Sequence, residues 1–300
     1  MLDIKFIRDN KDLIKEAARK KRIEFDVDEL ISIDNKRKEL LVHIEAKRAE
    51  QNDCNDKITG ADPETRAKFI EKMKDVKNAL ALEEDELKDV MKKWQMTMVQ
   101  VPNVPDISVP EGESDADNVE VRTWGEIVKP DFTPKTHIEL MENLDMVDLD
   151  RGAKVSGFRG YFLKGDGALL NFALWQFVTE HFTAKGGFTP MIVPSLLRRE
   201  SFVGTGYLPQ SEEDLYKTQD SDYLAGTAEV STMGYYMNEV IDKKDLPIKF
   251  FSFSPCFRRE AGSYVKDAKG IFRIHEFLKY EQVILCEASH EESARLHEEI

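Results

Sequence analysis

The sequence predicts an α+β protein in which a long antiparallel α-helical coiled-coil arm precedes a domain built on a mostly antiparallel sheet. Three observations predict this fold. Apolar residues before residue 100 follow a heptad repeat, a proline-rich segment interrupts the chain at 101–118, and short apolar runs with the two-residue period of strands follow it. Because proline disfavours both helices and central strands, we expect domains at 1–105 and 106–300.

The second helix of the arm carries a heptad seam. Steps of four and three residues separate its apolar positions, and Glu83 is the one polar break among Phe69, Met73, Val76, Leu80, Leu87, Val90 and Trp94. The stretch from Val27 to about Ile58 also has a helical period. Two such helices predict an arm over about 27–97.

The segment TGADPE separates the two helices. Gly60 suits a helix end, Asp62 an N-cap and Pro63 a first helical turn, so the helices are expected to run antiparallel. Hairpins of this kind commonly serve oligomerisation or spacing. Basic clusters on the first helix could contact phosphate or form an ordinary solvated face, and these alternatives stay open.

The composition is that of a soluble globular protein, with 41% hydrophobic and 33% charged residues. No apolar run approaches the roughly 18–20 residues that span a bilayer, and the N-terminus lacks a signal-peptide layout. We therefore expect a cytoplasmic protein with no membrane partner. Three scattered cysteines favour reduced thiols, and no ligand spacing predicts a metal site within this chain.

The net charge of −14 is unevenly distributed, with −1 in residues 1–105 and −13 in residues 106–300. The acidity therefore belongs to the second domain and leaves the arm nearly neutral. A net negative charge disfavours a nucleic-acid partner, because binding a polyanion draws on clustered Lys and Arg. Such a partner is thus disfavoured for the acidic second domain and not for the nearly neutral arm.

The second domain is expected to combine short strands with one strong helix. The helix is GALLNFALWQFVTEHFTAKG, and the strand-like runs are GYFLKG, TPMIVPS, IKFFSFSPCF and KYEQVILCE. No GxxxxGK[ST] or GxGxxG follows a strand, which argues against P-loop and Rossmann nucleotide sites.

The segment FRREAGSYVKDAKGIFRIHEF (257–277) is treated as two strands joined by a loop. A period of two places Arg258, Glu260, Arg273, Phe277 and Glu281 on one surface, with aromatic residues on the other. Two arginines, carboxylates and a ring suit a nucleoside triphosphate. The alternative is a sheet face with cross-strand ion pairs.

These motifs occur in an order that resembles bacterial-type seryl-tRNA synthetases, which belong to class II. The resemblance covers essentially all 300 residues and includes DNVEVRTWGE, AKVSGFRGYFLKGDGALLNFAL, GTGYLP, TAE and FRREAGSYVKDAKGIFRIHEFLKYE. It implies a class II catalytic domain that uses ATP and Mg²⁺ to activate L-serine as seryl-adenylate. It also implies transfer of serine to tRNA(Ser) and tRNA(Sec), with the arm holding the tRNA, and a homodimer.

The resemblance also implies roles for individual residues. Arg258 would be catalytic, holding the α-phosphate and the serine carboxylate, Glu260 would accept from the adenine amine, and Phe277 would stack on the adenine. The implied ATP-binding set is Arg258, Arg259, Glu260, Arg273, Ile274 and Phe277, and the implied serine-binding set is Thr227, Ala228, Glu229 and Glu281. Pro194 would lie near the dimer interface, Lys36, Arg37, Lys47 and Arg48 would contact tRNA, and the loop 262–270 would meet its acceptor end.

The chain also departs from the family pattern. Gly226 before TAE and Ser231-Thr232 after it stand where proline is usual, and Tyr207 stands where glutamine is usual. Motif 3 and its Mg²⁺-binding carboxylates do not appear before Ile300, so we expect the 300 residues to be a catalytically incomplete fragment. The other hypotheses are a non-catalytic, synthetase-like tRNA-binding protein and a plain coiled-coil scaffold.

Overall fold

The computed structural model describes residues 2–59, 62–261 and 270–300. Contacts within the chain divide it into two compact units, Met1–Gly125 and Glu126–Ile300. None of the helices in these described ranges combines the length and apolar character needed to cross a bilayer.

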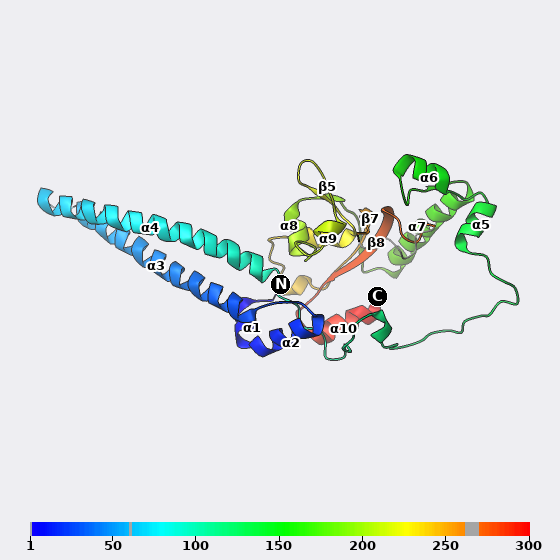
Figure 1. Ribbon diagram of the computed structural model, residues 1–300, viewed down its shortest axis with the longest axis horizontal. Coiled ribbons are helices and arrows are strands. Elements are labelled where there is room, and N and C mark those ends of the chain that lie inside the picture. Colours follow the sequence, from blue (N-terminus) through cyan, green and yellow to red (C-terminus); the bar gives the residue numbers. More distant parts are fainter. Residues whose placement is uncertain (1, 60–61, 262–269) are drawn as a thin grey trace. The chain divides into compact units, whose positions relative to one another are not determined.

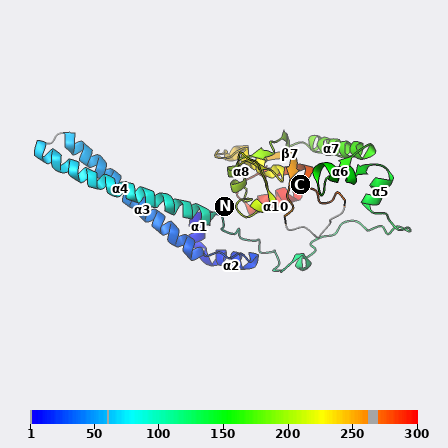
Figure 2. The ribbon, with the colours of Figure 1, turned by 45° about the horizontal axis from the view of Figure 1, so that its top comes forward.

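The first unit is helical. Its elements are α1 (Ile4–Asp9), α2 (Lys11–Lys21), α3 (Val27–Thr59), α4 (Pro63–Met98) and a 3₁₀ turn at Asp115–Asp117. Figure 1 shows α3 and α4 side by side along the arm, with α1 and α2 beside its base. Figure 2 shows the same arrangement after a rotation. The predicted helical hairpin is therefore confirmed.

Local sequence signals determine the start and the seam of α4. The Asp62 carboxylate accepts from the backbone N–H groups of Glu64 and Thr65 at 3.0 and 3.1 Å, and Pro63 opens the helix as expected. The seam residues are more buried than their neighbours, and Leu80 is the most buried of them at 8% exposed. The expected role of Gly60 falls outside the described residues.

A small apolar core closes the base of the arm. The residues Ile7, Ile14, Val27, Leu30, Ile31 and Met98 form it, and Trp94 packs against it. Because these side chains come from all four helices, the core joins α1 and α2 to the start of α3 and the end of α4.

The second unit is α+β. Its helices are α5 (His137–Asn143), α6 (Leu149–Ser156), α7 (Asp166–Lys185), α8 (Arg199–Gly204), α9 (Ala228–Gly234) and α10 (His290–Glu299), with 3₁₀ turns at Glu212–Asp214 and Lys243–Asp245. Its strands are β1 (Val147–Asp148), β2 (Phe162–Leu163), β3 (Thr189–Ile192), β4 (Leu196–Leu197), β5 (Tyr216–Lys217), β6 (Tyr223–Leu224), β7 (Ile248–Phe257) and β8 (Glu276–Leu285).

The strands form three small sheets, ordered β1-β2, β3-β7-β8 and β4-β6-β5. Within the described residues, four of the five strand pairs are antiparallel, and only β3 with β7 is parallel. The predicted fold class is confirmed: a helical arm comes first in the chain, and an α+β domain with a mostly antiparallel sheet follows it in the sequence.

Helix α7 packs on one face of the β7–β8 pair. Trp175 meets Phe253 and Tyr280 edge-on with ring centroids 5.4 Å apart, and Phe182 stacks on Phe251 at 5.2 Å. The aromatic face that the two-residue period predicted is therefore the core face, and the opposite face of the two strands is left for the site.

Candidate active site

Strands β7 and β8 carry a row of polar side chains on the face opposite α7. Their register pairs Ser252 with Glu281, Ser254 with Lys279, and Cys256 with Phe277. Directly paired residues of antiparallel strands project from the same face. Within the strands, the predicted polar surface is therefore confirmed.

The predicted extent of the two strands is wrong, because both are shorter than the sequence pattern indicated. Strand β7 ends at Phe257 and β8 begins at Glu276, so Arg258, Glu260 and Arg273 lie outside the ladder. Glu260 has φ of 54°, a left-handed conformation that ends any two-residue alternation. These three side chains are positioned by the ends of the hairpin and not by strand parity.

These hairpin ends enclose a cavity of about 710 Å³. Its lining residues are Arg258, Glu260, Ile271, Phe272, Arg273, Ile274 and Phe277. Five of the six residues expected to bind ATP line this cavity. The sixth, Arg259, is absent from the lining, and its backbone N–H donates to the Asp214 carbonyl at 3.0 Å.

Contacts inside the cavity combine the two alternatives that the sequence left open. Arg273 donates to the Glu260 carboxylate at 2.6 Å, which is an ion pair. Arg258 donates through Nε to the Gly226 carbonyl at 3.1 Å, and its guanidinium carbon lies 5.2 Å from the centroid of Phe277. The cavity is thus lined with two arginines, a carboxylate and an aromatic ring that contact one another or the neighbouring backbone.

Gly226 leaves space for the Arg258 side chain. A Cβ at position 226 would lie 3.2 Å from Arg258 Cγ and 3.4 Å from its Nε. Because Arg258 also hydrogen-bonds the carbonyl of this residue, the glycine permits close contact between the guanidinium and the backbone.

A second polar cluster lies on the same face of the hairpin. Thr227 is buried, caps α9, and donates its hydroxyl to Glu281. Lys279 donates to the same hydroxyl at 3.2 Å and forms an ion pair with Glu281. A hydroxyl, a carboxylate and an ammonium are thereby held together, and they can pair with the ammonium and hydroxyl of a small polar substrate.

The other two predicted serine-binding residues are placed differently. Ala228 is fully buried, whereas the Glu229 side chain is exposed. Glu229 also acts on Tyr207: burial raises the pKa of that phenol, the carboxylates of Glu229 and Glu281 raise it further, and Arg258 opposes them. Tyr207 therefore lies within the electrostatic range of both predicted sites.

An exposed apolar surface covers the outer side of α7. The exposed side chains are Leu169, Leu170, Phe172, Leu174 and Phe177, and Ile192 and Leu196 are exposed on β3 and β4. Pro194, the expected interface residue, lies between those strands and is exposed, while its carbonyl accepts a hydrogen bond from Ser231.

All four cations expected to contact tRNA form ion pairs inside the first unit. The pairs are Lys36–Glu86 at 3.2 Å, Arg37–Asp34 at 2.7 Å, Lys47–Glu83 at 2.6 Å and Arg48–Glu84 at 2.7 Å. Because Lys47 pairs with Glu83, the one polar residue in the heptad seam has a partner of opposite charge. Most of the loop expected to meet the tRNA acceptor end, residues 262–269, falls outside the described residues.

Comparisons with known proteins agree with the sequence motifs. Residues 1–105 match the seryl-tRNA synthetase N-terminal domain, and residues 213–299 match the tRNA synthetase class II core domain (G, H, P, S and T). The chain is 41% identical to a serine–tRNA ligase of Deinococcus radiodurans over 301 residues, covering all of this chain and 71% of that protein. It is 42% identical to a serine–tRNA ligase of Acetivibrio thermocellus, covering 99% of this chain and 71% of that protein.

The chain belongs to the serine–tRNA ligase family. Members of this family are ligases that form aminoacyl-tRNA, so the chain is an enzyme of that class.

Solved structures of serine–tRNA ligases match the fold as well. The seryl-tRNA synthetase of Pyrococcus horikoshii complexed with ATP matches with a TM-score of 0.85 and 35% identity, covering 100% of this chain and 72% of that one. The cytoplasmic serine–tRNA ligase of Naegleria fowleri in complex with AMP matches with a TM-score of 0.80 and 28% identity, covering 100% of this chain and 70% of that one.

Lys279, one residue of the second polar cluster, was not among the residues predicted from the sequence to bind a ligand. Lys279 was placed on the correct face by the two-residue period but was given no role. Its contact with Thr227 joins residues 52 positions apart. The two-residue period of the strand indicated the face on which Lys279 lies, but only the folded structure shows that its side chain contacts Thr227.

Proposed function

We propose that this chain activates L-serine with ATP at the β7–β8 hairpin and transfers it to tRNA(Ser) and tRNA(Sec) held by the arm. One observation carries the proposal: the cavity with five expected ATP-binding residues and the Thr227–Lys279–Glu281 cluster lie on one face of the same hairpin. In this proposal residues 1–105 form the tRNA-binding domain and residues 106–300 the catalytic domain, in a cytoplasmic enzyme.

The Pyrococcus and Naegleria structures, complexed with ATP and AMP, support a nucleotide in the cavity. The adenine would stack on Phe277 with its amine donating to Glu260, and the phosphates would replace Glu260 as the partner of Arg273. Arg258 is exposed at the cavity edge, where it can reach the α-phosphate and the serine carboxylate. Ile274 lines the wall, and Arg259 would contribute from outside it.

Serine would bind beside the nucleotide, at Thr227, Ala228, Glu229 and Glu281. The Glu281 carboxylate and the Thr227 hydroxyl supply an acceptor and a donor for the substrate ammonium and hydroxyl. The serine hydroxyl would join this buried cluster, and a site that hydrogen-bonds a substrate hydroxyl discriminates strongly against alanine, which lacks one.

In the first step the serine carboxylate attacks the α-phosphorus, forming the mixed anhydride while the bond to pyrophosphate breaks. In the second step a terminal ribose hydroxyl of tRNA attacks the acyl carbon and AMP leaves. Arg258 and Arg273 contribute by holding the phosphates in line and stabilising their charge.

ATP would enter as its magnesium complex. Within the described ranges no three His, Cys, Asp or Glu side chains are grouped to hold a metal ion. Magnesium is commonly held by substrate phosphates together with one or two carboxylates, so the nucleotide would carry most of its coordination.

The outer face of α7 and Pro194 would form a homodimer interface. Several large apolar side chains are exposed there together, and a contiguous exposed apolar surface marks a protein-interaction site. A second copy of the chain is the expected partner, because the resemblance implies a homodimer with Pro194 near its interface.

The proposal is tested by serine-dependent exchange of pyrophosphate into ATP, using protein expressed from its complete reading frame. Exchange should require serine, and exchange driven by threonine or proline instead would overturn the substrate assignment. Binding of tRNA(Ser) with no exchange for any amino acid would favour a non-catalytic tRNA-binding protein.

A further inference from the structure

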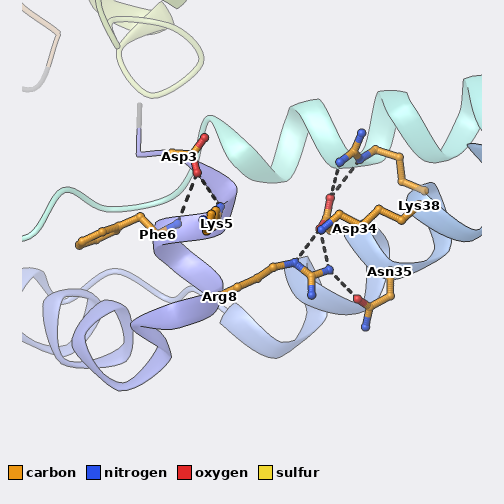
Figure 3. Close-up of polar contacts among 8 residues, drawn as sticks. Asp3, Lys5, Phe6, Arg8, Asp34, Asn35 and Lys38 are labelled. Atoms are coloured by element: carbon orange, nitrogen blue, oxygen red, sulfur yellow. Dashed lines mark hydrogen bonds and ion pairs between the residues drawn. The ribbon is translucent and has the colours of Figure 1, made fainter.

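A buried carboxylate lies at the base of the arm. Asp34 of α3 has no exposed side-chain surface, and three cations surround it (Figure 3). Arg8 contacts Oδ2 of Asp34 with two atoms: Nε donates at 2.7 Å, and Nη2 lies 2.6 Å from the same oxygen. Arg37 donates to Oδ1 at 2.7 Å, and the Lys38 ammonium lies 3.3 Å from Oδ2. Both carboxylate oxygens are therefore occupied.

These contacts connect three helices. Arg8 comes from α1 and also donates to Asn35, whereas Arg37 comes from α3 and places its guanidinium carbon 4.8 Å from the ring centroid of Trp94 in α4. The Trp94 ring packs against the apolar core at the base of the arm. Asp34 is the residue that Arg8 and Arg37 share.

The electrostatics make Asp34 sensitive to loss of its partners. Burial by itself would raise the pKa of the Asp34 carboxyl, but hydrogen bonds from Arg37, Arg8 and Lys38 outweigh it, and the pKa lies below its usual value. Removing one partner of a buried charge cluster leaves the others desolvated and unpaired, which is strongly unfavourable. The cluster therefore favours one packing of α1 against the arm.

We propose that Asp34 is a positioning residue for tRNA binding, and that Arg37 acts through Asp34 and Trp94 and not as a phosphate contact. This inference rests on the proposed function of the arm. The exposed fractions separate the two kinds of cation: the Arg37 side chain is 18% exposed, while that of Arg48, further along α3, is 61% exposed.

The length of the arm explains why its base matters. With a rise of about 1.5 Å per residue, Arg48 lies roughly 20 Å along α3 from Asp34, and a tilt of about 10° at the base moves it by roughly 4 Å. A displacement of that size exceeds the length of a hydrogen bond, about 3 Å. If the base is aligned for only about a tenth of the time, the apparent Kd for tRNA rises about tenfold.

Asp34→Asn distinguishes positioning from direct contact, because the two models predict opposite signs. If Arg8, Arg37 and Lys38 contact phosphate, removing the neighbouring negative charge should tighten tRNA binding. If Asp34 positions the arm, the same change should weaken binding about tenfold. A positioning residue should also leave the slope of log K against log[salt] unchanged, whereas loss of a phosphate contact lowers the slope by about 1.

The experiment measures binding of a tRNA(Ser) transcript across a salt series, together with aminoacylation kinetics, using protein expressed from its complete reading frame. For Asp34→Asn we expect an about tenfold higher Kd, an unchanged slope, and a rise in the KM for tRNA with kcat maintained. Asp28→Asn is the matched control, because Asp28 also lies in α3 and accepts from two cations, Lys11 and Lys15, but is 52% exposed. It should bind tRNA normally.

Tighter or unchanged binding by Asp34→Asn overturns the inference. If that variant loses helical circular dichroism, Arg8→Met, which leaves Asp34 with Arg37 and Lys38, is measured instead, with the same expectation and the same overturning result. Arg48→Gln should weaken binding and lower the slope. If removing residues 50–78 from the arm leaves tRNA binding intact, the proposed function of the arm is wrong. If that deletion abolishes tRNA binding but Asp34→Asn binds normally, only the inference about Asp34 is wrong.

Discussion

Arg273 and Glu260, which both line the candidate nucleotide cavity, form an ion pair at 2.6 Å although they lie thirteen positions apart in the chain. Both are expected to contact ATP, Arg273 at the phosphates and Glu260 at the adenine. The two charges therefore satisfy each other, and in the proposed function ATP would replace each as the partner of the other.

Arg273→Gln should raise the KM for ATP about 10- to 100-fold in serine-dependent pyrophosphate exchange. A hydrogen bond to a charged group contributes about 1.5–3 kcal/mol, and each 1.4 kcal/mol is a factor of ten. Lys243→Gln is the control, because Lys243 also pairs with a glutamate, Glu287 at 2.8 Å, but does not line the cavity. An unchanged KM for ATP in Arg273→Gln would remove this residue from the site.

Thr227→Val should raise the KM for serine about 10- to 100-fold while changing the KM for ATP little, because the loss falls on a hydroxyl bonded to charged groups. Thr232→Val is a matched control. Both threonines are 1% exposed, but Thr232 bonds the Ala228 carbonyl and Ser252, away from Lys279. Equal effects of the two variants on the KM for serine would mean that Thr227 acts only through stability.

Phe177→Glu should convert a dimer into monomers in sedimentation-velocity experiments, because it places a charge in the centre of the exposed apolar face of α7. Val240→Glu changes an apolar residue outside that face that is even more exposed, at 99% against 66% for Phe177, and should leave the sedimentation coefficient unchanged. If the wild-type chain sediments as a monomer at micromolar concentration, the homodimer proposal is wrong.

The stability of the first unit should fall in acid through Asp34. Its folded-state pKa is lowered, so its stabilising contribution is present above the unfolded carboxyl pKa of about 3.9 and is lost as pH falls through the lower folded value. Thermal unfolding followed by circular dichroism should show wild type more stable than Asp34→Asn at pH 7, with the difference narrowing below about pH 4. A difference that stays constant to pH 2 would contradict the charge-based account.

Local sequence spacing determined the elements of this protein. Asp62 and Pro63 start α4, a heptad repeat forms the seam of the arm, and a ten-residue run forms β7 over Ile248–Phe257. Each of these depends on neighbours within about one or two turns or along one strand, where residue type alone specifies backbone geometry. The family resemblance added the expectation that the loop 262–270 meets tRNA and that the residues at the hairpin ends bind ATP.

Only the tertiary structure decided which charged groups meet. Lys279 contacts Thr227, Arg8 contacts Asp34 over 26 positions, and Arg258 donates to the Gly226 carbonyl over 32 positions. Such pairs depend on how separate helices and strands pack, and their energies depend on burial. The residue type of a lysine or arginine does not reveal whether its side chain is exposed to solvent. The sequence alone therefore could not distinguish Arg37 at the buried base from Arg48 on the exposed arm.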